Sequence, residues 1–308
     1  MMETQKKRAN SSLLLYLLLA NGITWLCWIP GLVIGAQQGY AMPIPEMYAT
    51  LFRDGFVNTQ HMLLAIAFQL GVYGPLIAVL AAVWMKSGRE GLRNLWESVK
   101  KWKIAGRWYL TALLLAVTSA GLPVLIFGLV GGFTPGAYSL AYLLFMFVLQ
   151  LFTSGLGEEP GWRGFLLTKL KNRFEGKGNR YIWVLGFIWA IWHYPIVIIQ
   201  SLHGMPDVPM IQVVLGIVMN LAGFTMSVIG ETYLYVWLYN QTGSVFLAIW
   251  FHAFGNTFNT WFLSYLAEPA AATLFTALMP WFIVIVLQRT IGKDFMLRGP
   301  AGEAVKSQ

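Results

Sequence analysis

Long apolar runs separated by short polar stretches dominate the chain, and this pattern predicts membrane-spanning helices. Runs of about 20 apolar residues recur, which is the length that a helix needs to cross the hydrocarbon core of a bilayer. We therefore expect residues 1–308 to form a single transmembrane domain, an all-α polytopic membrane helix bundle of about eight transmembrane helices. The predicted spans are residues 11–35, 61–85, 108–132, 138–157, 181–200, 210–238, 244–266 and 269–289.

Basic residues gather in alternate connections between these spans. Lys and Arg precede the first span and follow the second, the fourth and the eighth. The intervening loops 36–60, 133–137, 201–209 and 267–268 hold one basic residue among them, Arg53. Because cytoplasmic loops carry the excess of Lys and Arg, both termini are predicted to be cytoplasmic.

Two segments outside the spans have their own expected behaviour. Segment 86–107 is basic, and its apolar residues recur at helical spacing, so we expect it to lie on the anionic inner leaflet. Those apolar residues are Leu92, Leu95, Trp96, Val99 and Trp102. The tail, residues 294–308, is expected to be mobile.

Composition supports a membrane protein and excludes several other classes. The chain is 57% hydrophobic and 11% charged, whereas a soluble domain carries about twice that charged fraction. The net charge of +8 resides in loops between apolar runs, so it indicates membrane orientation and no nucleic-acid partner. The single cysteine, Cys27, excludes an intramolecular disulfide and a cysteine-cluster metal site. The oligomeric state stays open.

A few polar residues interrupt the apolar runs, and they are the candidates for chemistry. Ionisable groups inside membrane helices are costly and tend to face a bundle interior or a wet cavity. At about 1.5 Å per residue, His193 and Asn256 are each about 18 Å from the inner end of their spans, and His252 is about 12 Å from it. We expect Glu158 and Glu159 to lie one or two helical turns deeper in the membrane than the end of their span. All five side chains could then meet in the cytoplasmic half of the membrane.

Glu231 is interpreted differently, because it lies near the predicted end of the long sixth span. That span is expected to tilt, to break or to leave the membrane near Gly230. We therefore expect the Glu231 carboxylate to be exposed, where it would cap a helix or pair with a loop base.

The stretch GLGEEPGWRGFLL, residues 155–167, places two carboxylates beside a proline. Pro160 disfavours helix at Glu159 and is tolerated at the start of a new helix, so a helix break is expected here. Arg163 lies four residues after Glu159, within reach of a salt bridge. One glutamate held by the arginine leaves the other free to accept a proton from water.

The seventh span carries a second polar pair. His252 and Asn256 are four residues apart and share a helix face, so together they can hydrogen-bond a carbonyl oxygen that develops negative charge. On the fifth span Trp189 lies four residues before His193. Its ring is expected to shield the pocket from water or to pack against a substrate.

These residues resemble three motifs of the CPBP family (CAAX protease and bacteriocin-processing, also called Abi) of intramembrane endopeptidases. EEPGWR resembles its EExxxR motif, WAIWH its FxxxH motif with Trp189 in place of Phe, and HAFGN its HxxxN motif. The resemblance covers a catalytic core of about residues 138–266. It implies an intramembrane peptidase, a CAAX-type hydrolase, in which Glu158 and His193 activate water. It also implies that His252 and Asn256 stabilise the oxyanion, with Glu159, Arg163 and Trp189 in support.

The substrate implied by the resemblance is a membrane-associated or lipidated protein or peptide, prenylated in some members of the family. It would be cleaved near the cytoplasmic face by glutamate-activated water. No cofactor is expected. The family breadth and the compact chain suggest an integral protein of a bacterial plasma membrane.

Two alternatives remain open at this point. One is a zinc-dependent version of the same protease, with Glu158, His193 and His252 as ligands. The chain has no HExxH motif, and asparagine is a poor zinc ligand, so the metal-free version is favoured. The other is a non-enzymatic membrane binder or transporter that uses the same polar cluster for a solute or a proton.

Overall fold

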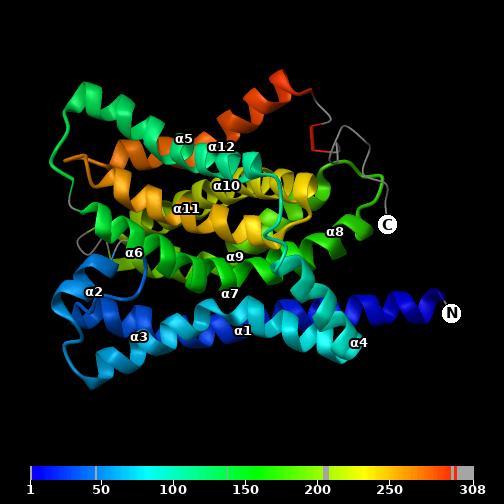
Figure 1. Cartoon of the computed structure of the whole chain (residues 1–308). Coiled ribbons are helices and arrows are strands. Elements are labelled where there is room, and N and C mark those ends of the chain that lie inside the picture. Colours follow the sequence, from blue (N-terminus) through cyan, green and yellow to red (C-terminus); the bar gives the residue numbers. More distant parts are fainter. Residues whose placement is uncertain (1, 46, 137, 204–207, 293–294, 297–308) are drawn as a thin grey trace.

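The described part of the protein is a bundle of helices (Figure 1). The computed structural model describes residues 2–45, 47–136, 138–203, 208–292 and 295–296 of the chain, and these residues include no strand. The helices are α1 (Met2–Gln38), α2 (Tyr48–Asp54), α3 (Thr59–Val72), α4 (Gly74–Val99), α5 (Gly106–Gly131), α6 (Leu140–Gln150), α7 (Leu156–Glu159), α8 (Leu167–Arg173), α9 (Arg180–His203), α10 (Met210–Thr242), α11 (Val245–Leu263) and α12 (Ala270–Thr290). Two π-helical turns, η1 (Leu151–Gly155) and η2 (Pro160–Leu166), join α6, α7 and α8. The all-α prediction is confirmed.

Most of the predicted spans appear as long apolar helices. Within the described residues, six helical stretches are long and apolar enough to cross a membrane, and the pair α3 and α4, bent by 47°, raises the number to as many as seven. The helix α11 stands where the seventh span was predicted but is not among those stretches. The polytopic architecture is therefore confirmed, while the count of eight remains a prediction.

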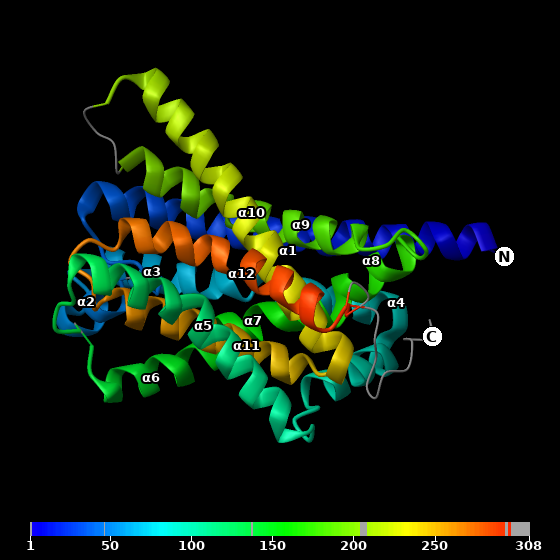
Figure 2. The same ribbon diagram turned by 90° about the horizontal axis from the view of Figure 1, so that it is seen from above.

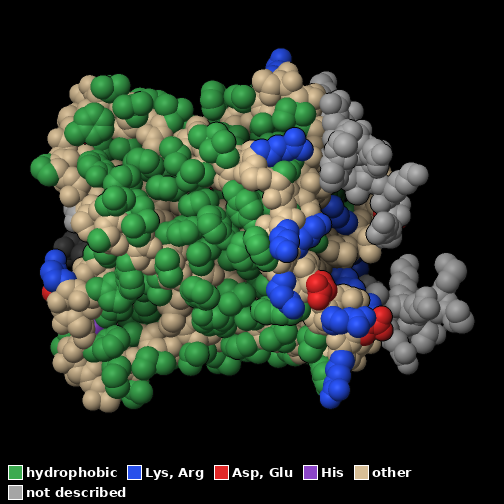
Figure 3. Space-filling view, viewed as in Figure 1, with side chains coloured by type: hydrophobic (Ala, Val, Ile, Leu, Met, Phe, Trp, Pro, Cys, Tyr) green, Lys and Arg blue, Asp and Glu red, His purple; other side chains and the backbone are tan. Residues whose placement is uncertain are grey.

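The helices run roughly along one direction, so that the bundle has two ends (Figures 1 and 2). The start of α1 and the connection between α4 and α5 lie at one end, and α2 lies at the other. Hydrophobic side chains cover the middle of the molecule, and the Lys and Arg residues gather toward the first end (Figure 3). This distribution supports the prediction that the first end, called the basic end below, faces the cytoplasm.

The basic segment 86–107 is only partly helical. The helix α4 continues to Val99 through a kink at Gly88. The φ angle of Gly88 is 56°, a left-handed conformation that glycine adopts at little energetic cost. Trp102 follows the helix end, so it is not part of the predicted helical face. Trp96 and Trp102 are 49% and 57% exposed, and the contact of this segment with the inner leaflet stays a prediction. Of the predicted mobile tail, 294–308, only Phe295 and Met296 are described, and both are buried; the rest lies outside the described residues.

The helical run from α6 to α8 passes through the interior of the bundle and carries the two glutamates. Its π turn η2 packs against α4, and α7 packs against α4 and α11. Trp162 of η2 and Trp192 of α9 are fully buried and meet edge to face, with ring centroids 5.9 Å apart. Large aromatic contacts of this kind fix α9 relative to the glutamate-bearing run.

Candidate active site

The glutamates lie inside a continuous helical run, which differs from the predicted helix break. Glu159 and Pro160 both have helical backbone angles, with φ/ψ of −64°/−34° and −59°/−35°. Pro160 opens the π turn η2, where the wider hydrogen-bond register accommodates a residue that lacks an N–H group. As a result Glu158 and Glu159 lie in the bundle interior, 3% and 0% exposed, and not at the end of a span.

Glycines in this run allow neighbouring backbones to approach closely. A Cβ atom on Gly157 would lie 2.9 Å from the carbonyl oxygen of Val72, and one on Gly161 would lie 2.8 Å from that of Pro75. These contacts bring the helices α3 and α4 against the glutamate-bearing run. The close approach at these glycines is therefore an approach of backbone.

Glu159 forms a buried ion-pair cluster. Its Oε1 atom accepts hydrogen bonds from Nη1 of Arg163 at 3.0 Å and from Nδ1 of His252 at 2.7 Å. The Arg163 guanidinium is fully buried, and its Cζ atom lies 4.2 Å from the ring centroid of Trp189 and 3.9 Å from that of Tyr235. The two aromatic faces stabilise the cation where water is excluded. Arg163 and Glu159 thus hold His252 in a fixed orientation.

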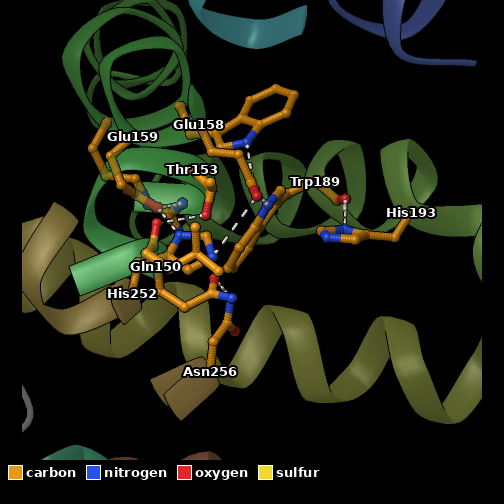
Figure 4. Close-up of polar contacts among 11 residues, drawn as sticks. Gln150, Thr153, Glu158, Glu159, Trp189, His193, His252 and Asn256 are labelled. Carbon is orange, nitrogen blue, oxygen red and sulfur yellow. Dashed lines mark hydrogen bonds and ion pairs between the residues drawn. The ribbon is translucent and has the colours of Figure 1, made fainter. Parts of the chain in front are cut away.

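Glu158 uses one carboxylate oxygen for structure and leaves the other facing His252. Its Oε2 atom accepts from Nε1 of Trp189 at 2.9 Å and, more weakly, from Nε1 of Trp162 at 3.4 Å. Its Oε1 atom lies 3.8 Å from Nε2 of His252. Figure 4 shows the two glutamates on opposite sides of this imidazole. The two glutamates therefore have different partners: Glu159 is bonded to a guanidinium and an imidazole, and Glu158 to two indoles.

His193 is oriented by its own helix. Its Nδ1 atom lies 3.0 Å from the carbonyl oxygen of Trp189, and because a carbonyl only accepts, Nδ1 carries the proton. In the neutral ring Nε2 is then an acceptor. Trp189 therefore does more than shield the pocket: it anchors Glu158 through its indole and His193 through its backbone.

Asn256 is oriented by a residue of the glutamate-bearing run. Its Nδ2 atom donates to Oε1 of Gln150 at 3.0 Å. Gln150 is 1% exposed, so the amide has a buried, fixed acceptor. An amide nitrogen carries two protons, and one stays available to a ligand. Figure 4 shows Asn256 beside His252, as the helical spacing predicted.

A cavity of about 540 Å³ connects these side chains. Glu158, Trp189, His193, His252 and Asn256 all line it, while Glu159 and Arg163 lie behind its wall. The structure thus brings the predicted residues together from α7, α9 and α11. The lining also reaches Pro43, Pro45 and Tyr48, which belong to the end of the bundle opposite the basic end.

The interpretation of Glu231 as an exposed residue near a span end is wrong. The helix α10 continues without a break from Met210 to Thr242, so Glu231 lies well inside it. Its side chain is half-buried and lines the same cavity as Glu158 and His252. An apolar run of this length gave no sign of where the helix would end, and this led to the misplacement.

Sequence reasoning also missed three residues that position the site. Gln150, Trp162 and Tyr235 contact Asn256, Glu158 and Arg163, respectively. A filter for uncharged amides in apolar runs would have found Gln150. Trp162 and Tyr235 give no signal of their own, because the chain has 14 Trp and 13 Tyr.

No metal cluster is evident in the part of the chain that the structure describes. There, no three His, Cys, Asp or Glu side chains are arranged to hold a metal ion. The imidazoles of His193 and His252 each use Nδ1 for a bond within the protein. Only their Nε2 atoms would be available to a ligand.

Comparison with known proteins identifies this site region. Residues 139–258 match the family described as type II CAAX prenyl endopeptidase Rce1-like, a segment that contains every residue named above as a predicted catalytic group. A comparison with curated proteins gives no match. Residues 139–258 of the chain therefore resemble the Rce1-like domain of this family of membrane proteases.

Proposed function

We propose that the protein hydrolyses a peptide bond within the membrane by means of a water molecule activated by Glu158 and His193. The observation that carries this proposal is the shared cavity: Glu158, His193, His252 and Asn256 line one space of about 540 Å³. In that space the Oε2 atom of Glu158 and the Nδ1 atom of His193 are already bonded to protein groups. Their partner atoms, Oε1 and Nε2, are the acceptors left for water.

The proton transfers follow from these two acceptors. Water donates one hydrogen bond to Oε1 of Glu158 and the other to Nε2 of His193. Glu158 takes a proton as the water oxygen bonds to the scissile carbonyl carbon, and the C=O electron pair moves onto the carbonyl oxygen. When that pair returns and the C–N bond breaks, Glu158 gives the proton to the leaving nitrogen.

The developing oxyanion is proposed to meet His252 and Asn256. Asn256 has its second amide proton for this oxygen, since the first is donated to Gln150. His252 donates through Nε2 when its ring carries both protons, and the carboxylate of Glu159 at Nδ1 favours this imidazolium form. Donors held in advance by buried partners need no reorganisation during the reaction.

The proposed substrate is a membrane-associated peptide or protein, lipidated or not, in a bacterial plasma membrane. The reacting groups are proposed to lie in the cytoplasmic half. His252 is seven residues after Val245, the start of α11, which is about 10 Å from the basic end. The family match gives no support to the alternative of a non-enzymatic binder or transporter.

Replacement of Glu158 by Gln tests the proposal directly. We expect peptide hydrolysis by the purified, reconstituted protein to fall by at least about a hundredfold, because the general base is removed. Thermal unfolding should show a folded protein, and Glu97→Gln, at an exposed position on α4, is the matched control. Undiminished turnover by the Glu158→Gln variant would refute the assignment.

Metal content separates this mechanism from the zinc-dependent alternative. We expect the purified, active protein to hold no stoichiometric zinc and to keep its activity in the presence of a chelator. Stoichiometric zinc whose removal abolishes activity would replace the proposal by one in which Glu158, His193 and His252 hold the metal.

A further inference from the structure

Glu231 is an unpartnered carboxylate inside the cavity that the proposed mechanism does not use. It projects from the middle of α10 and lines the same space as Glu158. No hydrogen bond or ion pair joins it to another residue that the structure describes. A carboxylate in such surroundings is costly unless it finds a proton or a cation.

Apart from the imidazoles of His193 and His252, the described lining of the cavity offers no side chain that can carry a positive charge. Two carboxylates, those of Glu158 and Glu231, belong to the described lining, and no lysine or arginine does. The nearby guanidinium, Arg163, is bonded to Glu159 and covered by the rings of Trp189 and Tyr235. No ion pair joins Arg163 to Glu231 among the described residues.

The rest of the lining suits a long basic side chain. Ser227 lies four residues before Glu231 on the same face of α10 and also lines the cavity. Trp28 and Phe224 contribute aromatic side chains to the wall. Aromatic faces attract ammonium and guanidinium groups, and they also pack against the methylene stems of Lys and Arg.

We infer that Glu231 is a specificity-determining residue that binds a Lys or Arg side chain of the substrate near the bond that is cleaved. This inference rests on the proposed function, because it places the peptide across Glu158. The same charge distribution disfavours an acidic side chain or a free carboxylate next to Glu231, since no lysine or arginine of the described lining would pair with it. The preferred substrate is therefore a membrane peptide with a basic residue beside an apolar stretch.

A peptide series tests the inference. The reconstituted wild-type protein is first given a library of apolar peptides, and the cleaved bonds are located by mass spectrometry. Three versions of one cleaved peptide are then compared, with Lys, Met or Glu at each position flanking the bond. We expect kcat/KM to be about 10- to 100-fold higher for the Lys version than for the Met version at one position, as a charge-assisted hydrogen bond would give.

Variants of Glu231 should change this ratio specifically. Glu231→Gln should bring the Lys-to-Met ratio close to one, and Glu231→Lys should favour the Glu version. Glu268→Gln, which removes an exposed carboxylate from the loop before α12, is the control and should keep the wild-type ratio.

The possible failures are distinguishable. If wild-type protein cleaves none of the peptides, the proposed function fails. If it cleaves them and Glu158→Gln does not, but Glu231→Gln keeps the wild-type ratio, the inference about Glu231 alone is overturned. If a folded Glu231→Gln protein loses kcat/KM equally for all three peptides, the inference about Glu231 is overturned as well. Glu231 would then act in the chemical step and not in substrate recognition.

Discussion

At the scale of single residues, the site depends on how two neighbouring glutamates acquire different partners. Glu159 meets a guanidinium and an imidazole, and Glu158 meets two indole N–H groups. Indoles are uncharged donors that fix a carboxylate without pairing its charge. In the proposed mechanism Glu158 therefore acts as the base toward water, while Glu159 acts through His252.

Trp189→Phe is expected to reduce kcat by about 10- to 100-fold. The change removes the indole donor at 2.9 Å from Glu158, keeps an aromatic face over Arg163, and leaves the backbone carbonyl that orients His193. Steady-state kinetics on the reconstituted protein measures the effect. Trp183→Phe, on the same helix at a 43% exposed position, should behave like wild type. A wild-type kcat for Trp189→Phe would show that the indole bond does not position Glu158.

At the scale of elements, the run from α6 to α8 combines two π turns with glycines at contact points. The π turns keep a proline inside a helical run, and the glycines let α3, α4 and α11 reach its backbone. This close packing lets a span that carries two glutamates and an arginine remain helical in the bundle interior. The charged groups are enclosed by protein and not by lipid.

Gly161→Ala should destabilise the protein by about 1–3 kcal/mol, because overpacking of a tight contact forces the neighbouring helices apart. Its Cβ would lie 2.6 Å from the Tyr16 hydroxyl and 2.8 Å from the Pro75 carbonyl oxygen. Thermal unfolding in detergent measures the change. Gly223→Ala on α10, where a Cβ meets nothing within 4 Å, is the matched control. If the two variants unfold at the same temperature, the packing account is wrong.

At the scale of the whole molecule, the cavity extends toward only one end of the bundle. It extends from the glutamates to residues 43, 45 and 48 at the end opposite the basic end, and it also touches the last turns of α9 at Gln200. No described residue of the connections at the basic end belongs to its lining. If the basic end is cytoplasmic, a substrate would reach the proposed catalytic groups from the other side of the membrane.

Thiol labelling can test this direction. In a Cys27→Ser background, which removes the single native cysteine, Gln200→Cys should react with a membrane-impermeant thiol reagent added outside intact cells. The adduct should also block peptide cleavage, since Gln200 lines the cavity. Ser87→Cys, exposed at the basic end, should react only after the cells are permeabilised. The opposite pattern of labelling would contradict the orientation.

The sequence by itself determined the helical class, the approximate spans and the residues worth examining. Apolar runs report burial in lipid, and the cost of an intramembrane charge singles out Glu158, His193 and His252. The Glu159–Arg163 pair was also predictable, because it depends only on the spacing of one helical turn.

Only the tertiary structure decided which side chains from different helices meet. His252 reaches Glu159 across 93 positions of sequence, and Trp189 reaches Glu158 across 31. The rotation and depth of each helix, set by contacts such as Gly157 against Val72, determine these meetings. The rotation of α10 likewise directs the Glu231 side chain toward the cavity. An apolar pattern cannot encode such rotations in a membrane, because the lipid-facing and the protein-facing sides of a helix are both apolar.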